Sequence, residues 1–142
     1  MKKWVCAGAA LLAAATLGLS GCGEKETSAP TEREEQRDVP QIGLSFDSFV
    51  IERWIRDRDV FVSTIKELGG EVNVQNANGD VEEQISQIEY FIEKGVDVIV
   101  VVAGDSEALT DVMRRAKDAR IRTLTYDRLI KNSGADLHIS FD

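Results

Sequence analysis

The chain has 142 residues, of which 43% are hydrophobic and 30% charged, and its formal net charge is −8. This length and composition are typical of one folded globular domain and exclude a collagen-like, disulfide-scaffold or wholly disordered protein. The acidic balance argues against nucleic-acid binding, because a module that grips phosphates needs a basic face. The chain has a single histidine, His138, which we interpret as structural. We therefore predict neither a histidine-based catalytic triad nor a metal site.

The first 21 residues are predicted to be a lipoprotein signal peptide. A short basic end precedes an apolar run from Trp4 to Leu19, which is short for a membrane span but has the length of a signal-peptide core. The run ends in LSGC, which resembles the lipobox of bacterial lipoproteins. We predict lipidation of Cys22 by palmitate-type acyl chains and an extracytoplasmic, membrane-anchored protein. The alternatives are an uncleaved helical anchor and an ordinary secretory signal.

Residues 22–40 are predicted to form a flexible tether. The segment from Gly23 to Pro40 is polar and charged and has no apolar period, so it cannot bury enough surface to offset its ordering entropy. Cys6 lies in the predicted signal peptide and Cys22 at the predicted lipidation site. No disulfide is therefore expected in the folded part of the chain.

From residue 41 onward, short apolar runs alternate with amphipathic stretches. Strands are predicted at 42–46, 71–75, 96–102, 122–126 and 137–141, and helices at 51–68, 80–94 and 106–119. The first strands begin about 24 to 29 residues apart, close to the ~30 of a βαβ unit. The Val/Ile run at 96–102 is typical of a strand covered on both faces. We predict an α/β fold with an open, mostly parallel, doubly wound (Rossmann-like) sheet.

The second predicted helix carries clear boundary signals. Asp80 is expected to cap it, with Glu83 completing a capping box, and Gly95 is expected to end it. The predicted inward stripe is formed by Val81, Ile85, Ile88 and Ile92. Gln87 is predicted to lie outside this stripe, among the charged residues.

Polar residues follow the predicted strands where a ligand of such a sheet would bind, beyond the carboxyl ends. The set includes carboxylates, an amide, guanidinium groups and one aromatic side chain. Carboxylates and amides accept from vicinal hydroxyls, a guanidinium donates as a planar fork, and an indole packs against the apolar face of a sugar ring. We predict a site for a small polyol at Asp47, Arg53, Trp54, Asn78, Asp127 and Arg128.

Some of these candidates and their neighbours also have a purely structural interpretation. Trp54 has helical spacing with Phe61 and could belong to the core. Asp127 and Arg128 could be an exposed ion pair worth less than about 1 kcal/mol. Asn76 and Asp80 are best explained as turn and cap residues.

Five segments of the chain resemble bacterial sugar-binding proteins of the ribose and xylose type. ERWIRDRD at 52–59 and YDR at 126–128, in that order, resemble the D-xylose-binding branch that serves ABC importers. The wider segments are IGLSFDSFVIERWIRDRDVFV (42–62), VQNANGDVEEQISQIE (74–89), GVDVIVV (95–101), TYDRL (125–129) and ISFD (139–142). The resemblance implies the amino-terminal lobe of a type I periplasmic-binding-protein fold over residues 41–142.

The resemblance also implies a function and assigns roles to residues. It implies a receptor without catalytic activity or cofactor that delivers a pentose, D-xylose, to an ABC permease. Asp47, Arg53 and Trp54 match first-loop and first-helix contacts, with Trp54 stacking on the sugar. Asn78 matches a polar contact after the second strand. Asp127 and Arg128 match the pair that grips ring hydroxyls.

The chain departs from the family pattern in its length. Family members have two lobes that close around the sugar, whereas this sequence ends at Asp142, so we expect a single lobe, a half-site and some exposed apolar surface. The alternative function is a lipid-anchored, sugar-sensing adaptor for a sensor kinase or chemoreceptor ectodomain. No nucleophile and base pair is visible, so we do not expect an enzyme.

Overall fold

A computed structural model of the protein describes residues 39–141. The predicted signal peptide, Cys22, nearly all of the predicted tether and Asp142 lie outside the described residues. None of the helices in the described part is long and apolar enough to cross a membrane.

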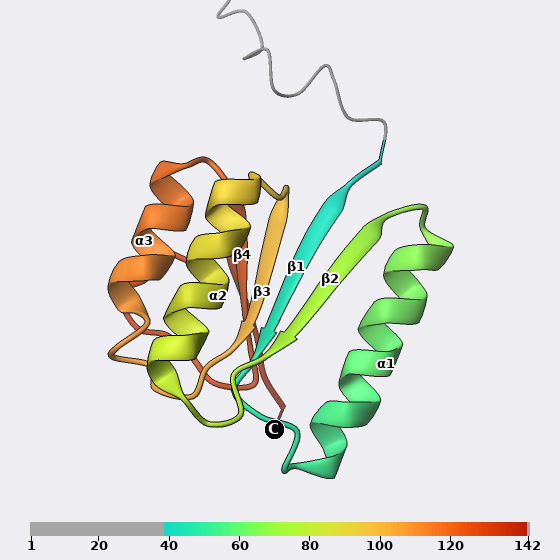
Figure 1. Ribbon diagram of the computed structural model, residues 1–142, viewed down its shortest axis with the longest axis horizontal. Helices are drawn as coiled ribbons and strands as arrows, with labels where there is room; N and C mark the ends of the chain where they lie inside the picture. Colours follow the sequence, from blue (N-terminus) through green and yellow to red (C-terminus); the bar gives the residue numbers. More distant parts are fainter. Residues whose placement is uncertain (1–38, 142) are drawn as a thin grey trace, which may run out of the picture. The chain divides into compact units, whose positions relative to one another are not determined.

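The strands form one parallel sheet with the order β2-β1-β3-β4-β5 (Figure 1). Their bounds are β1 Gln41–Phe46, β2 Glu71–Asn76, β3 Val98–Val102, β4 Arg122–Tyr126 and β5 Leu137–Ile139. Every neighbouring pair runs parallel, so the predicted α/β class is confirmed. β4 has the predicted bounds, whereas β5 ends at residue 139, two residues before the predicted end.

Helices cover both faces of this sheet (Figure 1). They are α1 Glu52–Glu67, α2 Val81–Lys94 and α3 Thr110–Asp118. One apolar layer lies between α1 and the sheet, and a second lies between the sheet and α2 with α3. This arrangement confirms the predicted doubly wound architecture.

The central strand β3 divides its side chains between the two layers. Val100 and Val102 belong to the layer under α1, whereas Ile99 and Val101 belong to the layer under α2 and α3. This division follows from the alternation of side chains along a strand. All four side chains are buried, which confirms the prediction of a strand covered on both faces.

α2 begins and ends at the predicted signals, although the capping box is only half formed. The Asp80 carboxylate accepts hydrogen bonds from the backbone N–H groups of Glu82 and Glu83 at 2.9 and 3.1 Å. The reciprocal bond from Asp80 N–H to the Glu83 carboxylate is replaced, because Asp80 N–H donates to the carbonyl oxygen of Ala77 at 2.9 Å. Gly95 ends the helix in the left-handed conformation, with φ of 61°.

The Asp80→Ala substitution is expected to destabilise the fold by about 1 kcal/mol, because two N–H groups of α2 lose their cap. Urea unfolding followed by circular dichroism measures this loss. The matched control is Asp111→Ala, which removes an exposed ion pair with Arg114 at 3.1 Å in the first turn of α3. It should cost about 0.5 kcal/mol or less. Equal losses for the two variants would contradict the capping role of Asp80.

α3 begins four residues later than predicted. The Asp105 carboxylate accepts from Glu107 N–H at 2.8 Å and from Ala108 N–H at 3.0 Å. These bonds hold residues 106–109 as turns ahead of the helix, because a short acidic side chain competes for backbone donors. The apolar positions were predicted correctly, since Leu109, Val112, Met113 and Ala116 are all buried.

β5 lies at one edge of the sheet and leaves apolar side chains exposed. Its register with β4 pairs Leu124 with Leu137 and Tyr126 with Ile139, so both β5 residues lie on the α1 side. The exposed fractions are 52% for Leu137, 39% for Ile139 and 55% for Phe141 beyond the strand. This exposure agrees with the expectation from sequence that apolar surface is left uncovered.

Candidate site at the carboxyl edge of the sheet

The carboxyl ends of the strands meet at one edge of the sheet, which we call the carboxyl edge (Figure 1). Hydrogen bonds between backbone groups hold together the segments that follow the strands at this edge. Asp47 N–H donates to Val102 O at 2.9 Å, and Asp127 N–H donates to Ile139 O at 2.8 Å. Parallel register thus brings together residues that are far apart in the sequence.

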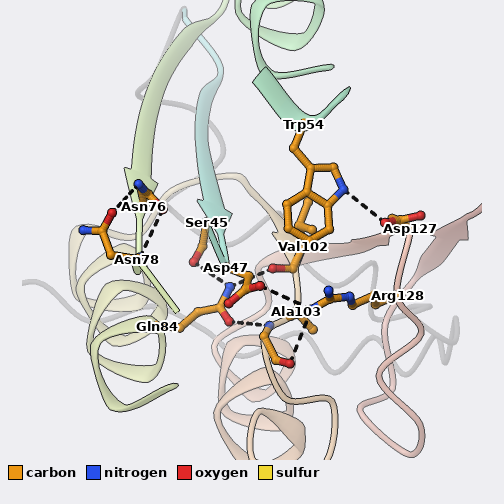
Figure 2. Close-up of polar contacts among 11 residues, drawn as sticks. Ser45, Asp47, Trp54, Asn76, Asn78, Gln84, Val102, Ala103, Asp127 and Arg128 are labelled. Carbon is orange, nitrogen blue, oxygen red and sulfur yellow. Dashed lines mark hydrogen bonds and ion pairs between the residues drawn. The ribbon is translucent and has the colours of Figure 1, made fainter. Parts of the chain in front are cut away.

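The structure brings five of the six predicted ligand-binding residues into one cluster. We call it the carboxyl-edge cluster, and its members are Asp47, Arg53, Trp54, Asp127 and Arg128. Arg53 Nη2 lies 2.9 Å from Asp127 Oδ1. The other carboxylate oxygen, Oδ2, accepts from Trp54 Nε1 at 3.1 Å (Figure 2). The first turn of α1 is thereby tied to the residue that follows β4.

Arg128 connects the other side of the cluster. Its Nη1 donates to Ala103 O at 2.7 Å and to Asp47 Oδ2 at 3.3 Å (Figure 2). Its guanidinium carbon lies over the Trp54 ring, 4.9 Å from the centroid, which is a cation–π geometry. Arg128 therefore bridges the segments that follow β1 and β3.

Asp127 has an uncommon backbone conformation. Its φ is 66°, in the left-handed region where Asp and Asn are the most tolerated residues apart from glycine. The next residue folds back, since Arg128 N–H donates to Tyr126 O at 2.8 Å. This sharp turn directs the Asp127 and Arg128 side chains to different partners within the same cluster.

Trp54 is a core residue in this structure and also touches the cluster. Its side chain is 1% exposed and belongs to the apolar layer under α1. The Arg128 guanidinium covers one face of the indole. The structure thus places Trp54 beneath the guanidinium. Stacking of Trp54 on the sugar, which the resemblance implies, stays a prediction.

Asn78 lies apart from the carboxyl-edge cluster, beyond β2 (Figure 2). Its side-chain oxygen accepts from Asn76 Nδ2 at 2.7 Å, and its backbone N–H donates to Asn76 Oδ1 at 3.1 Å. Its φ is 53°, as in a tight turn. Gly79 N–H donates to Asp47 O at 2.9 Å, so this turn is tied to the cluster through the backbone.

A buried polar network that was not predicted from the sequence lies on the other face of the sheet. Ser45 is 0% exposed, Gln84 1% and Gln87 4%. Ser45 Oγ lies 3.1 Å from Gln87 Oε1, to which it donates, and accepts from Gln84 Nε2 at 3.3 Å. The prediction that Gln87 lies outside the inward stripe is therefore wrong. Helical spacing with Ile88 and Phe91 could have revealed both glutamines.

The ion pairs of the cluster control its protonation. Burial raises the pKa of Asp127, but hydrogen bonds from Arg53 and Trp54 and the charges of Arg53 and Arg128 outweigh it and bring the pKa below its ordinary value. The hydrogen bond to Asp127 raises the pKa of Arg53. Burial and the nearby Asp57 carboxylate raise the pKa of Tyr126 to about 12. These three groups therefore keep one charge state at neutral pH.

The lowered pKa of Asp127 predicts a loss of stability in acid. The contribution is present above about pH 4, the ordinary aspartate pKa, and is lost as the pH falls through the lower folded-state value. Thermal unfolding followed from about pH 2 to about pH 7 should show stability falling toward acid pH. Asp127→Asn should make this fall less steep. Part of the acid dependence should remain in this variant, because backbone hydrogen bonds from Ala108 and Glu107 also lower the pKa of Asp105. A slope unchanged by Asp127→Asn would contradict the account.

Residues 39–141 contain no group of three His, Cys, Asp or Glu side chains that could hold a metal ion. An open hollow of about 340 Å³ lies elsewhere, between the amino end of β1, Asn73 of β2 and the carboxyl end of α2 around Tyr90 and Lys94. The carboxyl-edge cluster does not line this hollow. We favour the cluster as the site, because converging charged groups beyond parallel strands are the usual ligand-binding arrangement of such sheets.

A parallel sheet, helices on both faces and charged side chains converging at the carboxyl edge define the class of α/β ligand-binding lobes. A family model described as a periplasmic binding protein domain matches residues 42–142. The chain belongs to this family, which confirms the resemblance found in the sequence.

The curated relatives of the chain include several sugar-binding proteins. The D-xylose-binding periplasmic protein of Haemophilus influenzae is 48% identical over 102 residues, which cover 72% of this chain and 31% of that protein. The protein of the same name in Escherichia coli is 45% identical over the same length and with the same coverage. The multiple sugar-binding periplasmic receptor ChvE of Rhizobium radiobacter is 36% identical over 106 residues, 74% of this chain and 30% of that protein. The chain thus spans about a third of the length of these relatives.

A solved structure agrees with this assignment. An ABC transporter solute-binding protein from Clostridium phytofermentans with bound β-D-glucose has a TM-score of 0.69 and 33% identity. The match covers 72% of this chain and 32% of that protein. The described residues therefore form a single lobe of the periplasmic-binding-protein fold.

Proposed function

We propose that the chain is the sugar-binding lobe of an extracytoplasmic receptor that serves an ABC importer, with D-xylose as the sugar bound at the carboxyl-edge cluster. The relatives named for D-xylose, at 45 and 48% identity, support the choice of sugar. The chain covers about a third of those proteins, so the lobe supplies one wall of the site.

The observation that carries the proposal is the way Arg128 is held. Within residues 39–141, every hydrogen bond of its guanidinium uses Nη1, which leaves Nη2 and Nε–H available to a ligand. The Arg128 side chain is 40% exposed, and that of Arg53 is 38% exposed. Two anchored guanidinium groups thus present donors at the carboxyl edge.

The charges of the cluster suit a neutral ligand. Arg53 is paired with Asp127 and Arg128 with Asp47, so the two cations and two anions of the cluster balance. One further carboxylate, Asp57, lies 3.8 Å from Arg53 beside the cluster. Hydroxyl groups both donate and accept, and a sugar can therefore satisfy guanidinium donors and carboxylate oxygens together. A binding role without catalysis needs no further group, and the relatives are named as binding proteins.

The proposed receptor is anchored to the outer face of the cytoplasmic membrane through acyl chains on Cys22, at the end of a tether to residue 40. The support is the lipobox-like LSGC sequence. Detergent phase partition of the chain from a bacterial host tests it. The unmutated chain should enter the detergent phase and Cys22→Ser should stay in the aqueous phase, whereas equal partition would contradict lipidation.

Calorimetric titration of the full chain with D-xylose tests the sugar site. We expect binding by the unmutated chain and a loss of about tenfold or more in affinity for Asp127→Asn, which breaks a charge-assisted pair. The matched control is Glu89→Gln, because Glu89 pairs with Arg115 between α2 and α3, outside the cluster. Its affinity should be unchanged. Absence of heat with the folded, unmutated chain at millimolar xylose would refute the proposal for this chain.

A further inference from the structure

The Gln84 side chain spans the segment that leads from β3 toward α3. It comes from α2 and is 1% exposed. Its Nε2 donates to Val102 O at 2.9 Å, and its Oε1 accepts from Gly104 N–H at 2.8 Å (Figure 2). One buried amide therefore fixes the backbone on both sides of Ala103.

Arg128 depends on the same short segment. Its Nη1 donates to Ala103 O at 2.7 Å and approaches Gly104 O at 3.5 Å. Figure 2 shows Gln84 and Arg128 on opposite sides of Ala103. The backbone that Gln84 holds is thus the backbone that directs the guanidinium.

Gly104 couples this segment to Asp47 as well. A Cβ at Gly104 would lie 2.7 Å from Asp47 Oδ1 and 3.3 Å from Gln84 Oε1. Such close packing leaves the segment little room to move without displacing Asp47, the ion-pair partner of Arg128.

We propose that Gln84 is a positioning residue for the sugar site: its amide fixes residues 102–104 so that Arg128 is held by Nη1, with Nη2 and Nε–H presented to the ligand. The inference rests on the proposed sugar-binding function for its role, and on the described contacts for its geometry. Gln84 acts through the backbone and does not itself touch the sugar.

Gln87 provides a matched control within the same helix. It is also buried, at 4% exposed, and it accepts from Ser45 and donates to Glu83. Its side-chain hydrogen bonds do not involve residues 102–104. Gln84→Met and Gln87→Met therefore remove the same chemical group from the same buried network, but only the first releases the segment that holds Arg128.

The test measures the Arg128 side chain by NMR in the full chain, with and without D-xylose. The guanidinium lies over the Trp54 ring, so its Nε–H and δ-protons should carry an upfield ring-current shift in the unmutated chain. Gln84→Met should lose this shift and weaken xylose binding about tenfold, the effect of losing one charge-assisted contact. Gln87→Met should keep both the shift and the affinity.

The outcomes separate the inference from the proposed function. A folded Gln84→Met chain that keeps the shift, or equal losses in the two variants, would overturn the positioning role. An unmutated chain that shows the shift but does not respond to xylose would refute sugar binding, while the comparison of shifts would still decide the role of Gln84.

If Gln84→Met does not fold, hydrogen exchange in the unmutated chain tests the positioning role of Gln84. The Gly104 amide should be protected, and exchange at the unprotected rate would overturn the inference.

Discussion

Replacing Trp54 with alanine is expected to lower the free energy of unfolding by about 3–5 kcal/mol, the range for removing a large aromatic side chain from a core. The indole is 1% exposed within the apolar layer under α1, so the substitution leaves a cavity there. It also removes the Nε1 donor to Asp127. Urea unfolding followed by circular dichroism measures the loss.

Trp54→Phe separates packing from hydrogen bonding. Phenylalanine retains an aromatic ring in the layer but lacks the donor to Asp127, so we expect a smaller loss of about 1–2 kcal/mol. Similar losses for the alanine and phenylalanine variants would show that packing of the indole contributes little. A loss below about 1 kcal/mol for Trp54→Ala would contradict its place in the core.

Replacing Gly43 with alanine is expected to destabilise the fold by about 1–3 kcal/mol through overpacking. A Cβ at this position would lie 2.6 Å from two ring carbons of Phe91, a fully buried residue of α2. Strand geometry itself tolerates alanine, so the cost comes from the close approach of α2 to β1. Chemical denaturation provides the measurement.

A second substitution tests whether this contact is the cause. Phe91→Leu removes the ring that the new methyl group would meet, so Gly43→Ala should cost less in the Phe91→Leu background than in the unmutated chain. We expect a coupling energy of about 0.5–3 kcal/mol, as is usual for residues in contact. Additive losses would exclude the ring of Phe91 as the obstacle.

Regular patterning allowed most of the fold to be predicted from the sequence. The valine and isoleucine run at 98–102 has no polar interruption and was predicted as a strand, although β3 begins at Val98, two residues later than predicted, after Asp97. β4 has the predicted bounds. Asp80 and Gly95 mark the ends of α2 through local chemistry that needs no tertiary context. Residues 106–109 were predicted to be helical, because the helical spacing of the apolar positions gives no sign of the Asp105 side-chain hydrogen bonds that hold these residues as turns.

Long-range contacts limited the prediction of the site. Asp47, Asp127 and Arg128 follow predicted strands in the sequence. They could be predicted to lie at one edge of the sheet, because parallel strands end together. The sequence could not show that the Trp54 ring lies under Arg128, since that contact joins residues from distant segments. Gln84 was missed because a polar residue is normally assigned to the outer face of a helix. Its buried partners lie on β1, at the end of β3 and in the segment after β3.

Amide NMR of the ¹⁵N-labelled full chain titrated with D-xylose tests the central claim most directly, because each backbone amide reports its own position. The account predicts that the largest shift changes occur at Asp47, Gly104, Asp127 and Arg128, at the carboxyl edge. Amides at the opposite edge, such as those of Gln41 and Asp97, whose contacts lie at the amino ends of the strands, should stay unchanged. A folded chain with no shift changes at millimolar xylose, or with changes confined to the amino ends, would contradict it.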